Sequence, residues 1–442
     1  MKFNTEQQLL EYTEYIKGKT FGQIDREGLL KIGNKDKGVL GKVVETGFYG
    51  YKLNSDAKAD FDNLGIELKV TGYVVNKDGS KTPKERLSLS MINYNAIINE
   101  EFEFSKLLFK NRKMLIIWYE YIKDINYSDF QITEFQLYDM TPDIEVIKND
   151  FYMIRNKVQV GQAHLLSEGD TTFLGAATKG SKGSVCTQPN SPIIAKPRAF
   201  CLKNSYMRGV LRNPNLKYIS PVKEIKTVEE YILNKLQPFI NLSQADIWKR
   251  ISGKNVEDYK VIPYQLNKLI SNKIIGSDET LKDNNDLFNK TECVIKNLPV
   301  KSDLYPIERL TYRNIRLSEF ELPWEESQWK VFFEEMTFLI ILYEGDKHGY
   351  RKLKTVKKVT FTPEEIAIFG QSYNMIRETI ATKDVTKLPY PKSFSEQLLE
   401  VAPKGKAGAR AYQTFFDQDM PKVCFMLNKD FIYKKIKDSS FL

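Results

Sequence analysis

KADFDNLGIELKV, residues 58–70, contains the strand around which the rest of the sequence can be organised. Within it, apolar and charged residues alternate strictly over 66–70, which is the pattern of a β-strand with one buried face. The apolar residues would face a core, whereas Glu67 and Lys69 would share the opposite face. Asp60 lies a short distance upstream. The stretch therefore predicts a strand that presents a carboxylate and an amine beside a second carboxylate.

The spacing of these three polar residues is that of the PD-(D/E)xK nuclease core: an Asp, six intervening residues, then Glu-x-Lys. Two carboxylates that converge from a loop and a strand form an oxygen-rich site, and Mg²⁺ prefers such ligands while it retains several waters. A lysine beside them can position or deprotonate a water. The alternative is an ordinary solvated sheet face, on which a Glu–Lys pair contributes little. The first interpretation predicts Asp60 and Glu67 as metal ligands and Lys69 as a catalytic residue.

The composition restricts the classes of function. The chain has 442 residues, 42% apolar and 28% charged, with a net charge of +9 and only two histidines. An excess of basic residues suits a polyanionic partner such as nucleic acid. The four cysteines are widely separated, so a zinc site is not expected, and the scarcity of histidine disfavours Ser-His and Cys-His nucleophiles. No apolar run is long enough to span a bilayer and no signal peptide is recognisable, which predicts a cytoplasmic protein.

The periodicity around the quoted strand predicts a mixed α/β architecture. Helices are expected at 5–16, 38–50 and 142–163, and a turn at 77–83 predicts a hairpin-like connection. Strands at 85–92 and 113–122 are expected to complete one mixed sheet with the strand of residues 66–70.

Three short matches indicate a long internal repeat. TKG (178–180) matches PKG (403–405) and FCL (200–202) matches FML (425–427), both at an offset of 225. MLIIWYE (114–120) matches FLIILYE (338–344) at an offset of 224. A period this long indicates a duplicated domain and not a solenoid. The expected domains are 1–212 and 227–442, joined by a polar linker at 213–226.

The repeat predicts that the two halves differ in chemistry. FDNLGIELK (61–69) falls on FNKTECVIK (288–296), so that Val294 takes the place of Glu67 and Leu287 that of Asp60. Only the lysine is retained, as Lys296. The second half is therefore expected to lack the metal site.

Three stretches resemble a known family: GVLGKVVETGFYG (38–50), ADFDNLGIELKV (59–70) and GQAHLLSEGDTTFLGAATKGS (161–181). They are similar to MutH, the methyl-directed mismatch-repair endonuclease, and still more to the MutH-like type II restriction endonucleases that cut at GATC. The resemblance implies a PD-(D/E)xK restriction-endonuclease-like fold, duplicated as two MutH-like domains. It places the metal-binding carboxylates on Asp60 and Glu67 and the catalytic lysine on Lys69, and it adds Glu45 and Lys110 to the catalytic set.

The resemblance also suggests which residues contact DNA. In the glycine-rich basic loop GAATKGSKGS (175–184), Lys179 matches a family lysine that contacts guanine in the major groove. The stretch KPRAFCLKNSYM (196–207) matches a strand whose tyrosine senses adenine methylation in MutH, but this chain has Cys201 there. Hemimethylation dependence of the MutH kind is therefore not expected. The other candidate DNA-binding residues are Lys182, Arg198, Lys203, Lys404 and Lys406.

The sequence thus predicts a Mg²⁺-dependent type II (type IIE) restriction endonuclease for double-stranded DNA, with GATC as its target by resemblance. The second domain is expected to be inactive and to bind DNA as an allosteric effector. A DNA-induced dimer and a cognate DNA methyltransferase in the same restriction-modification system are the expected partners. The alternatives are a strand-nicking mismatch-repair endonuclease and a non-catalytic DNA-binding regulator.

Overall fold

The computed structural model describes residues 2–30, 38–51, 58–76, 78–181, 183–212, 227–257, 263–277, 280–281, 286–345, 350–404, 412–415 and 418–439. The chain divides into two compact units. The first unit contains 1–164 and 171–220, and the second contains 165–170 and 221–442. The predicted linker, 213–226, lies outside the described residues.

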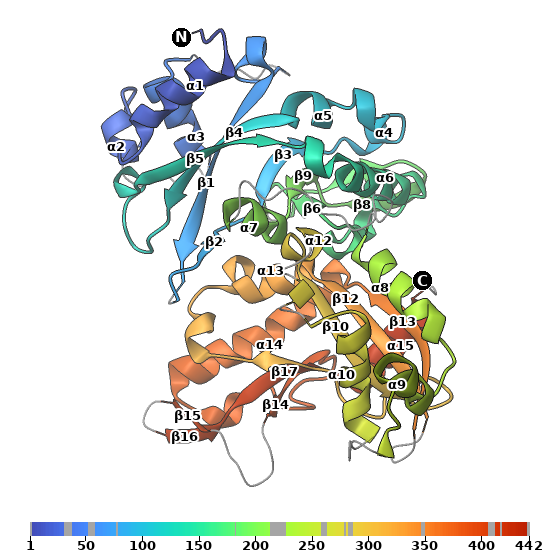
Figure 1. Ribbon diagram of the computed structural model, residues 1–442. Coiled ribbons are helices and arrows are strands. Elements are labelled where there is room, and N and C mark those ends of the chain that lie inside the picture. The colour runs from blue at the N-terminus through green and yellow to red at the C-terminus, as the bar shows by residue number, and fades with distance from the viewer. Residues whose placement is uncertain are drawn as a thin grey trace. The chain divides into compact units, whose positions relative to one another are not determined.

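The first unit is built on a four-stranded mixed sheet with the order β2-β1-β4-β5 (Figure 1). Its strands are β1 (Ile66–Val75), β2 (Lys81–Pro83), β4 (Lys113–Glu120) and β5 (Ile132–Asp139). β1 and β4 are parallel, whereas β2 and β5 are antiparallel to their neighbours. Because β4 is central, it is apolar and buried along nearly its whole length, which is why MLIIWYE does not alternate.

The apolar face of β1 packs against a helical layer, as the alternation predicts. Ile66 and Leu68 belong to a core cluster that also contains residues of α3 (Val39–Val43) and of the π-helical turn η2 (Val44–Phe48) that continues it. Gly47 permits the close approach of this turn, because a Cβ there would lie 1.9 Å from the carbonyl oxygen of Ile24. The other helices of the amino-terminal part are α1 (Glu6–Thr13) and α2 (Phe21–Ile24), both capped by threonine side chains.

A second, three-stranded sheet with the order β3-β9-β6 completes the first unit. Its strands are β3 (Leu87–Met91), β6 (Leu174–Thr178) and β9 (Arg198–Leu202), and the hairpin of β7 (Cys186–Gln188) and β8 (Ser191–Ala195) connects the last two. The accompanying helices are α4 (Tyr94–Ile97), α5 (Lys106–Asn111), α6 (Ile144–Gln159) and α7 (Asn204–Arg212).

The prediction that strand 85–92 shares the sheet of β1 and β4 is wrong. β3 pairs instead with β9, with Leu87 opposite Leu202. The alternation of leucine and serine in β3 requires one buried face but does not specify a partner, and the partner that forms lies more than a hundred residues downstream.

Asp150 ties helix α6 to the start of β6. Its buried carboxylate accepts hydrogen bonds from the main-chain N–H groups of Thr172, Phe173 and Leu174, at 2.7, 2.6 and 2.9 Å. These bonds fix the beginning of the strand that leads to Lys179. A buried charge of this kind is stable only when its hydrogen bonds are made.

The second unit contains strands in a similar order. One sheet has the order β10-β12-β13, in which β10 is parallel to β12 and β13 is antiparallel to β12. Another sheet has the order β11-β17-β14. The strands are β10 (Cys293–Val300), β11 (Thr311–Asn314), β12 (Thr337–Glu344), β13 (Lys352–Val359), β14 (Leu399–Pro403), β15 (Tyr412–Phe415), β16 (Gln418–Pro421) and β17 (Val423–Leu427). β15 and β16 pair with each other.

The second unit also contains several helices. They are α8 (Val228–Leu236), α9 (Gln244–Ser252), α10 (Pro263–Ile274), α12 (Asp286–Asn289), α13 (Gln328–Glu335), α14 (Pro363–Thr382) and α15 (Lys429–Asp438). α14 contacts β14 and α15 contacts β13, as can be followed in Figure 1. Among the described residues, no helix is both long and apolar enough to cross a membrane.

Candidate active site

The loop before β1 brings Asp60 beside the strand. A short turn, η3 (Asp62–Leu64), is closed by Gly65 in the left-handed conformation at φ 63°, which suits glycine. The main-chain N–H of Leu68 donates a 2.9 Å hydrogen bond to Oδ2 of Asp60. This bond holds the Asp60 carboxylate next to the strand residue that follows Glu67.

Glu67 is the centre of a group of charged side chains. It is 4% exposed, and its Oε1 lies 3.0 Å from Nζ of Lys69 and 3.4 Å from Nζ of Lys110 on α5. Its other carboxylate oxygen, Oε2, is buried and has no hydrogen-bond partner within the described part of the chain. Such an orphaned acceptor is costly unless another group ligates it.

Glu45 completes the group from the helical side. Burial, together with the negative charges of Asp60 and Glu67, raises the pKa of Glu45 to about 7, while the charge of Lys110 opposes the rise. Burial likewise raises the pKa of Glu67, and the ammonium of Lys69 counteracts this. The five residues predicted to be catalytic are therefore close in space, with three carboxylates facing two lysines.

The donor set fits a hard divalent cation. Among the described residues there is no group of three or more His, Cys, Asp and Glu side chains arranged to hold one ion. Mg²⁺ does not need such a cage, because it is usually bound by one or two carboxylates and keeps several waters. Asp60 and Glu67 supply two carboxylates, and Oε2 of Glu67 has no hydrogen-bond partner among the described residues. The residues present therefore fit a divalent metal ion.

A hollow that the sequence prediction missed is lined by α5 and by the turn that precedes β1. It has a volume of about 780 Å³ and is lined by Gly65, by basic residues such as Arg112, and by two aromatic side chains of the α5 region. Phe104 and Phe109 are 90% and 71% exposed, which is unusual for phenylalanine. The sequence carries a signal for this hollow in EFEFSKLLFKNRK (101–113), where aromatic and basic residues interleave.

Lys179 follows β6 directly and is partly exposed. Its main-chain N–H donates a 2.8 Å hydrogen bond to the carbonyl of Pro197, which anchors the start of the loop to the strand leading into β9. Lys182 lies outside the described residues. The structure therefore describes the base of the loop, where Lys179 is a partly exposed basic residue.

Two other candidate DNA-binding residues are buried. Arg198 is 4% exposed and donates a 2.6 Å hydrogen bond to the carbonyl of Ala176. Lys203 is 1% exposed and donates to the carbonyl of Thr171 at 2.5 Å, and its charge opposes the rise in the pKa of buried Asp150. Both side chains act within the second sheet of the first unit, so we do not include them in a DNA-contacting surface. Cys201 on β9 is likewise fully buried.

The corresponding place in the second unit has different chemistry. Val294 is the second residue of β10 and pairs with Phe338, just as Glu67 is the second residue of β1 and pairs with Met114. Leu287 is buried in α12. Lys404 donates a 2.6 Å hydrogen bond to the carbonyl of Tyr312, and Lys406 lies outside the described residues.

Known proteins are similar to this chain over about half or nearly all of its length. Residues 49–150, which contain most of the catalytic group, match the family model described as the DNA mismatch repair enzyme MutH. The type II restriction enzyme Sau3AI of Staphylococcus aureus is 30% identical, over 91% of this chain and 93% of its own length. The DNA mismatch repair proteins MutH of Actinobacillus pleuropneumoniae and of Histophilus somni are each 25% identical, over 48% and 47% of this chain and 94% of their own lengths.

The repair proteins thus correspond to about half of the chain, whereas the restriction enzyme corresponds to nearly all of it. The chain belongs to the MutH-like family of type II restriction endonucleases, and it is a site-specific deoxyribonuclease.

Proposed function

We propose that the first unit hydrolyses phosphodiester bonds of double-stranded DNA with Mg²⁺ held by Asp60 and Glu67. The observation that carries the proposal is the convergence of Glu45, Asp60, Glu67, Lys69 and Lys110 around a buried carboxylate oxygen without a hydrogen-bond partner in the described chain. When bound, the ion would offset charge on the scissile phosphate and lower the pKa of a coordinated water.

The protein's own side chains would position the reactants. Lys69, held 3.0 Å from Glu67, has its amine on the side of the strand where the carboxylates converge, so it can orient the attacking water or accept its proton. Lys110 supplies a second positive charge beside Glu67. Glu45, with its raised pKa, can exchange a proton near neutral pH. The basic residues that line the hollow with Phe104 and Phe109 would contact phosphates of the DNA.

We propose GATC as the target, by resemblance, and Lys179 as a residue that reads it. A lysine is suited to the O6 and N7 acceptors of guanine. Cleavage is expected to leave 5′-phosphate and 3′-hydroxyl ends, and protection of the host would require a cognate DNA methyltransferase.

Replacing Lys179 by alanine is expected to weaken specific binding by about 1–3 kcal/mol and non-specific binding much less, since a base contact discriminates between sequences. The measurement is the affinity of full-length protein for cognate and random duplexes in chelator. Lys19→Ala, an exposed lysine of the first unit, is the control. An equal loss on both duplexes would demote Lys179 to a phosphate contact.

We further propose that the second unit is a degenerate copy of the first and an allosteric DNA-binding effector. The similar strand orders support the copy, and the replacement of both carboxylates by Leu287 and Val294 supports the loss of catalysis.

In the full-length enzyme, a substrate with two target sites is therefore expected to be cut faster than one with a single site. A short cognate duplex added in trans should rescue the one-site substrate, with a coupling of about 1–3 kcal/mol. The measurement is the cleavage rate at equal site concentration, with a random duplex as control. Rates that are independent of site number and of added duplex would contradict the effector role and leave the endonuclease assignment intact.

A strand-nicking repair enzyme and a non-catalytic regulator are the alternatives. The share of the chain covered by the restriction enzyme argues against the first, and the intact catalytic group argues against the second. Digestion of plasmid DNA with unmethylated, hemimethylated and fully adenine-methylated target sites, in Mg²⁺ and in chelator, followed by mapping of the ends, tests the proposal. Double-strand breaks only in Mg²⁺ support it, nicks only at hemimethylated sites favour the repair enzyme, and no cleavage favours the regulator.

A further inference from the structure

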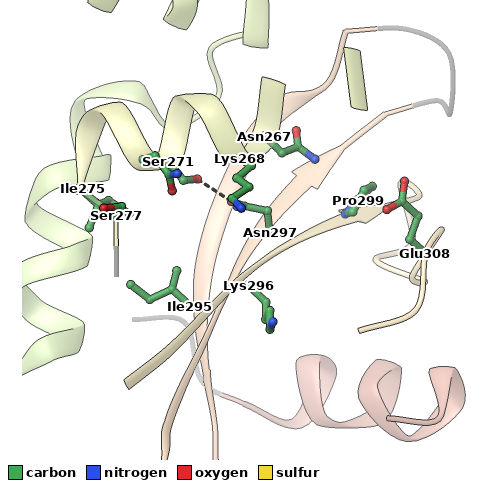
Figure 2. A pocket seen from close by; sticks show the side chains of 12 residues that line it. Asn267, Lys268, Ser271, Ile275, Ser277, Ile295, Lys296, Asn297, Pro299 and Glu308 are labelled. Carbon is green, nitrogen blue, oxygen red and sulfur yellow. Dashed lines mark hydrogen bonds between the residues drawn. The ribbon is translucent and has the colours of Figure 1, made fainter. Parts of the chain in front are cut away.

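The second unit has a polar pocket of about 520 Å³ between helix α10 and strand β10, for which the proposed function has no use (Figure 2). Asn267, Lys268 and Ser271 line it from the helix, and Asn297 lines it from the strand. The Oγ of Ser271 donates a 2.5 Å hydrogen bond to Oδ1 of Asn297, which Figure 2 shows as a dashed line. The pocket thus presents amides, a hydroxyl and a lysine within one hollow.

The pocket occupies the place in the second unit that the catalytic group occupies in the first. Lys296 lines it, and this lysine is the fourth residue of β10 as Lys69 is the fourth residue of β1. β10 is parallel to β12, as β1 is parallel to β4. Each of these two strands, β10 and β1, packs against a helix that comes before it in the chain.

The helices can be matched as well. α10 and the helix of α3 and η2 are each followed by a glycine with positive φ, Gly276 at 108° and Gly50 at 68°. Counting back equally from these glycines, Ser271 takes the position of Glu45. The carboxylate that approaches Glu67 in the first unit has become a neutral hydroxyl in the second.

This exchange changes the charge of the site. In the first unit, three carboxylates repel a phosphate unless a cation lies between them. In the second unit, serine, leucine and valine stand at those positions, and Lys268 and Lys296 both line the pocket. Glu308 is the carboxylate among the lining residues, and it interacts electrostatically with Arg351 and Lys429. The site has therefore lost the negative charge that makes a metal ion necessary.

We propose that this pocket binds a phosphate group directly, without a metal ion, and that the phosphate is one of the duplex DNA backbone. Lysine ammonium groups and asparagine N–H groups are common partners of phosphate oxygens, and Lys268, Lys296 and Asn297 supply them here. The pocket would hold one backbone position in place while other residues of the unit contact the rest of the duplex. This inference deepens the effector role proposed for the second unit and rests on it.

Lysine footprinting of the full-length protein in chelator tests the pocket. A short cognate duplex is expected to slow acylation of Lys268 by about fivefold, as an ion pair of moderate strength would, whereas Lys249 on α9 is expected to react unchanged. Mass spectrometry of the modified peptides reads each lysine separately. Adding Mg²⁺ to the Glu67→Gln variant, in which cleavage of the duplex is suppressed, is expected to leave the protection of Lys268 unaltered.

Variants distinguish binding of a phosphate in the pocket from non-specific shielding of Lys268 by bound DNA. Asn272→Glu places a carboxylate at an exposed lining position and is expected to abolish the protection of Lys268. Gln265→Glu adds the same charge to the same helix outside the lining and should preserve it. Ser271→Glu restores the residue type of the first unit, and its folding can be checked by thermal unfolding.

Inorganic phosphate provides a second probe. Protection of Lys268 by phosphate as well as by the duplex supports a pocket open to any phosphate group, and protection by the duplex alone supports a backbone phosphate. No protection by either probe, protection that requires Mg²⁺, or protection that survives Asn272→Glu would overturn the proposal. The footprint is independent of cleavage rates, so its failure is distinguishable from failure of the effector role.

Discussion

Replacement of Glu67 by glutamine is expected to reduce single-turnover cleavage by at least about 10²–10³-fold, the usual cost of removing one group that stabilises charge in a transition state. The substitution keeps the shape of the side chain but removes the charge that faces Lys69 and Lys110. Duplex binding in chelator is expected to be unchanged or tighter, since a negative charge near a polyanion has been removed.

Asp62→Asn is the matched control. Asp62 lies in the same loop but is exposed and pairs with Lys58 at 3.2 Å, away from Glu67. This variant should cut at the wild-type rate. Undiminished cleavage by Glu67→Gln, with Asp60→Asn also active, would show that the catalytic site lies elsewhere.

Lys69→Ala is expected to cost about 10²–10⁴-fold in the single-turnover rate if the amine positions or deprotonates the water. Lys69 is 14% exposed and 3.0 Å from Glu67, so it is held in place. A change in this rate of less than about threefold, the size of effect typical of an exposed ion pair, would favour the alternative that Glu67 and Lys69 form an ordinary ion pair on the face of the strand.

A pH profile separates this role from a purely electrostatic one. The charge of Lys69 lowers the pKa of Glu67 against the effect of burial, so its removal raises that pKa further. If Lys69 only kept Glu67 ionised, raising the pH would restore the activity of Lys69→Ala, because Glu67 would again lose its proton. If Lys69 acts on the water, the loss persists at high pH, and Lys69→Arg remains impaired as well.

The proximity of Asp60, Glu67 and Lys69 was predictable because the information for it is local. Alternation placed Glu67 and Lys69 on one face, and a short turn ending at Gly65 returned Asp60 to the strand. The proximity of Glu45 and Lys110 could be expected only from the resemblance, since each reaches Glu67 from a separate element.

Other features depend on contacts that the sequence does not mark. Arg198 and Lys203 are basic residues near the loop of Lys179, and only the pairing of β9 with β6 shows that they donate to buried carbonyls. The prediction that β3 shares a sheet with β1 and β4 was wrong for the same reason, because its true partner, β9, is distant in the chain. The pocket of the second unit could not be predicted because its lining comes from α10 and β10, which the sequence does not mark as neighbours.

The central claim is that the metal ion lies between Asp60 and Glu67 in the first unit and has no counterpart in the second. Oxidative cleavage of the protein with Fe²⁺ in place of Mg²⁺ measures this directly, because radicals formed at the bound ion cut the nearby backbone. We expect cuts close to residues 60 and 67, suppressed by excess Mg²⁺ and absent from Glu67→Gln, with none near 287–294. Cuts around 287–294, or none near Asp60 and Glu67 in the wild-type protein, would contradict the account.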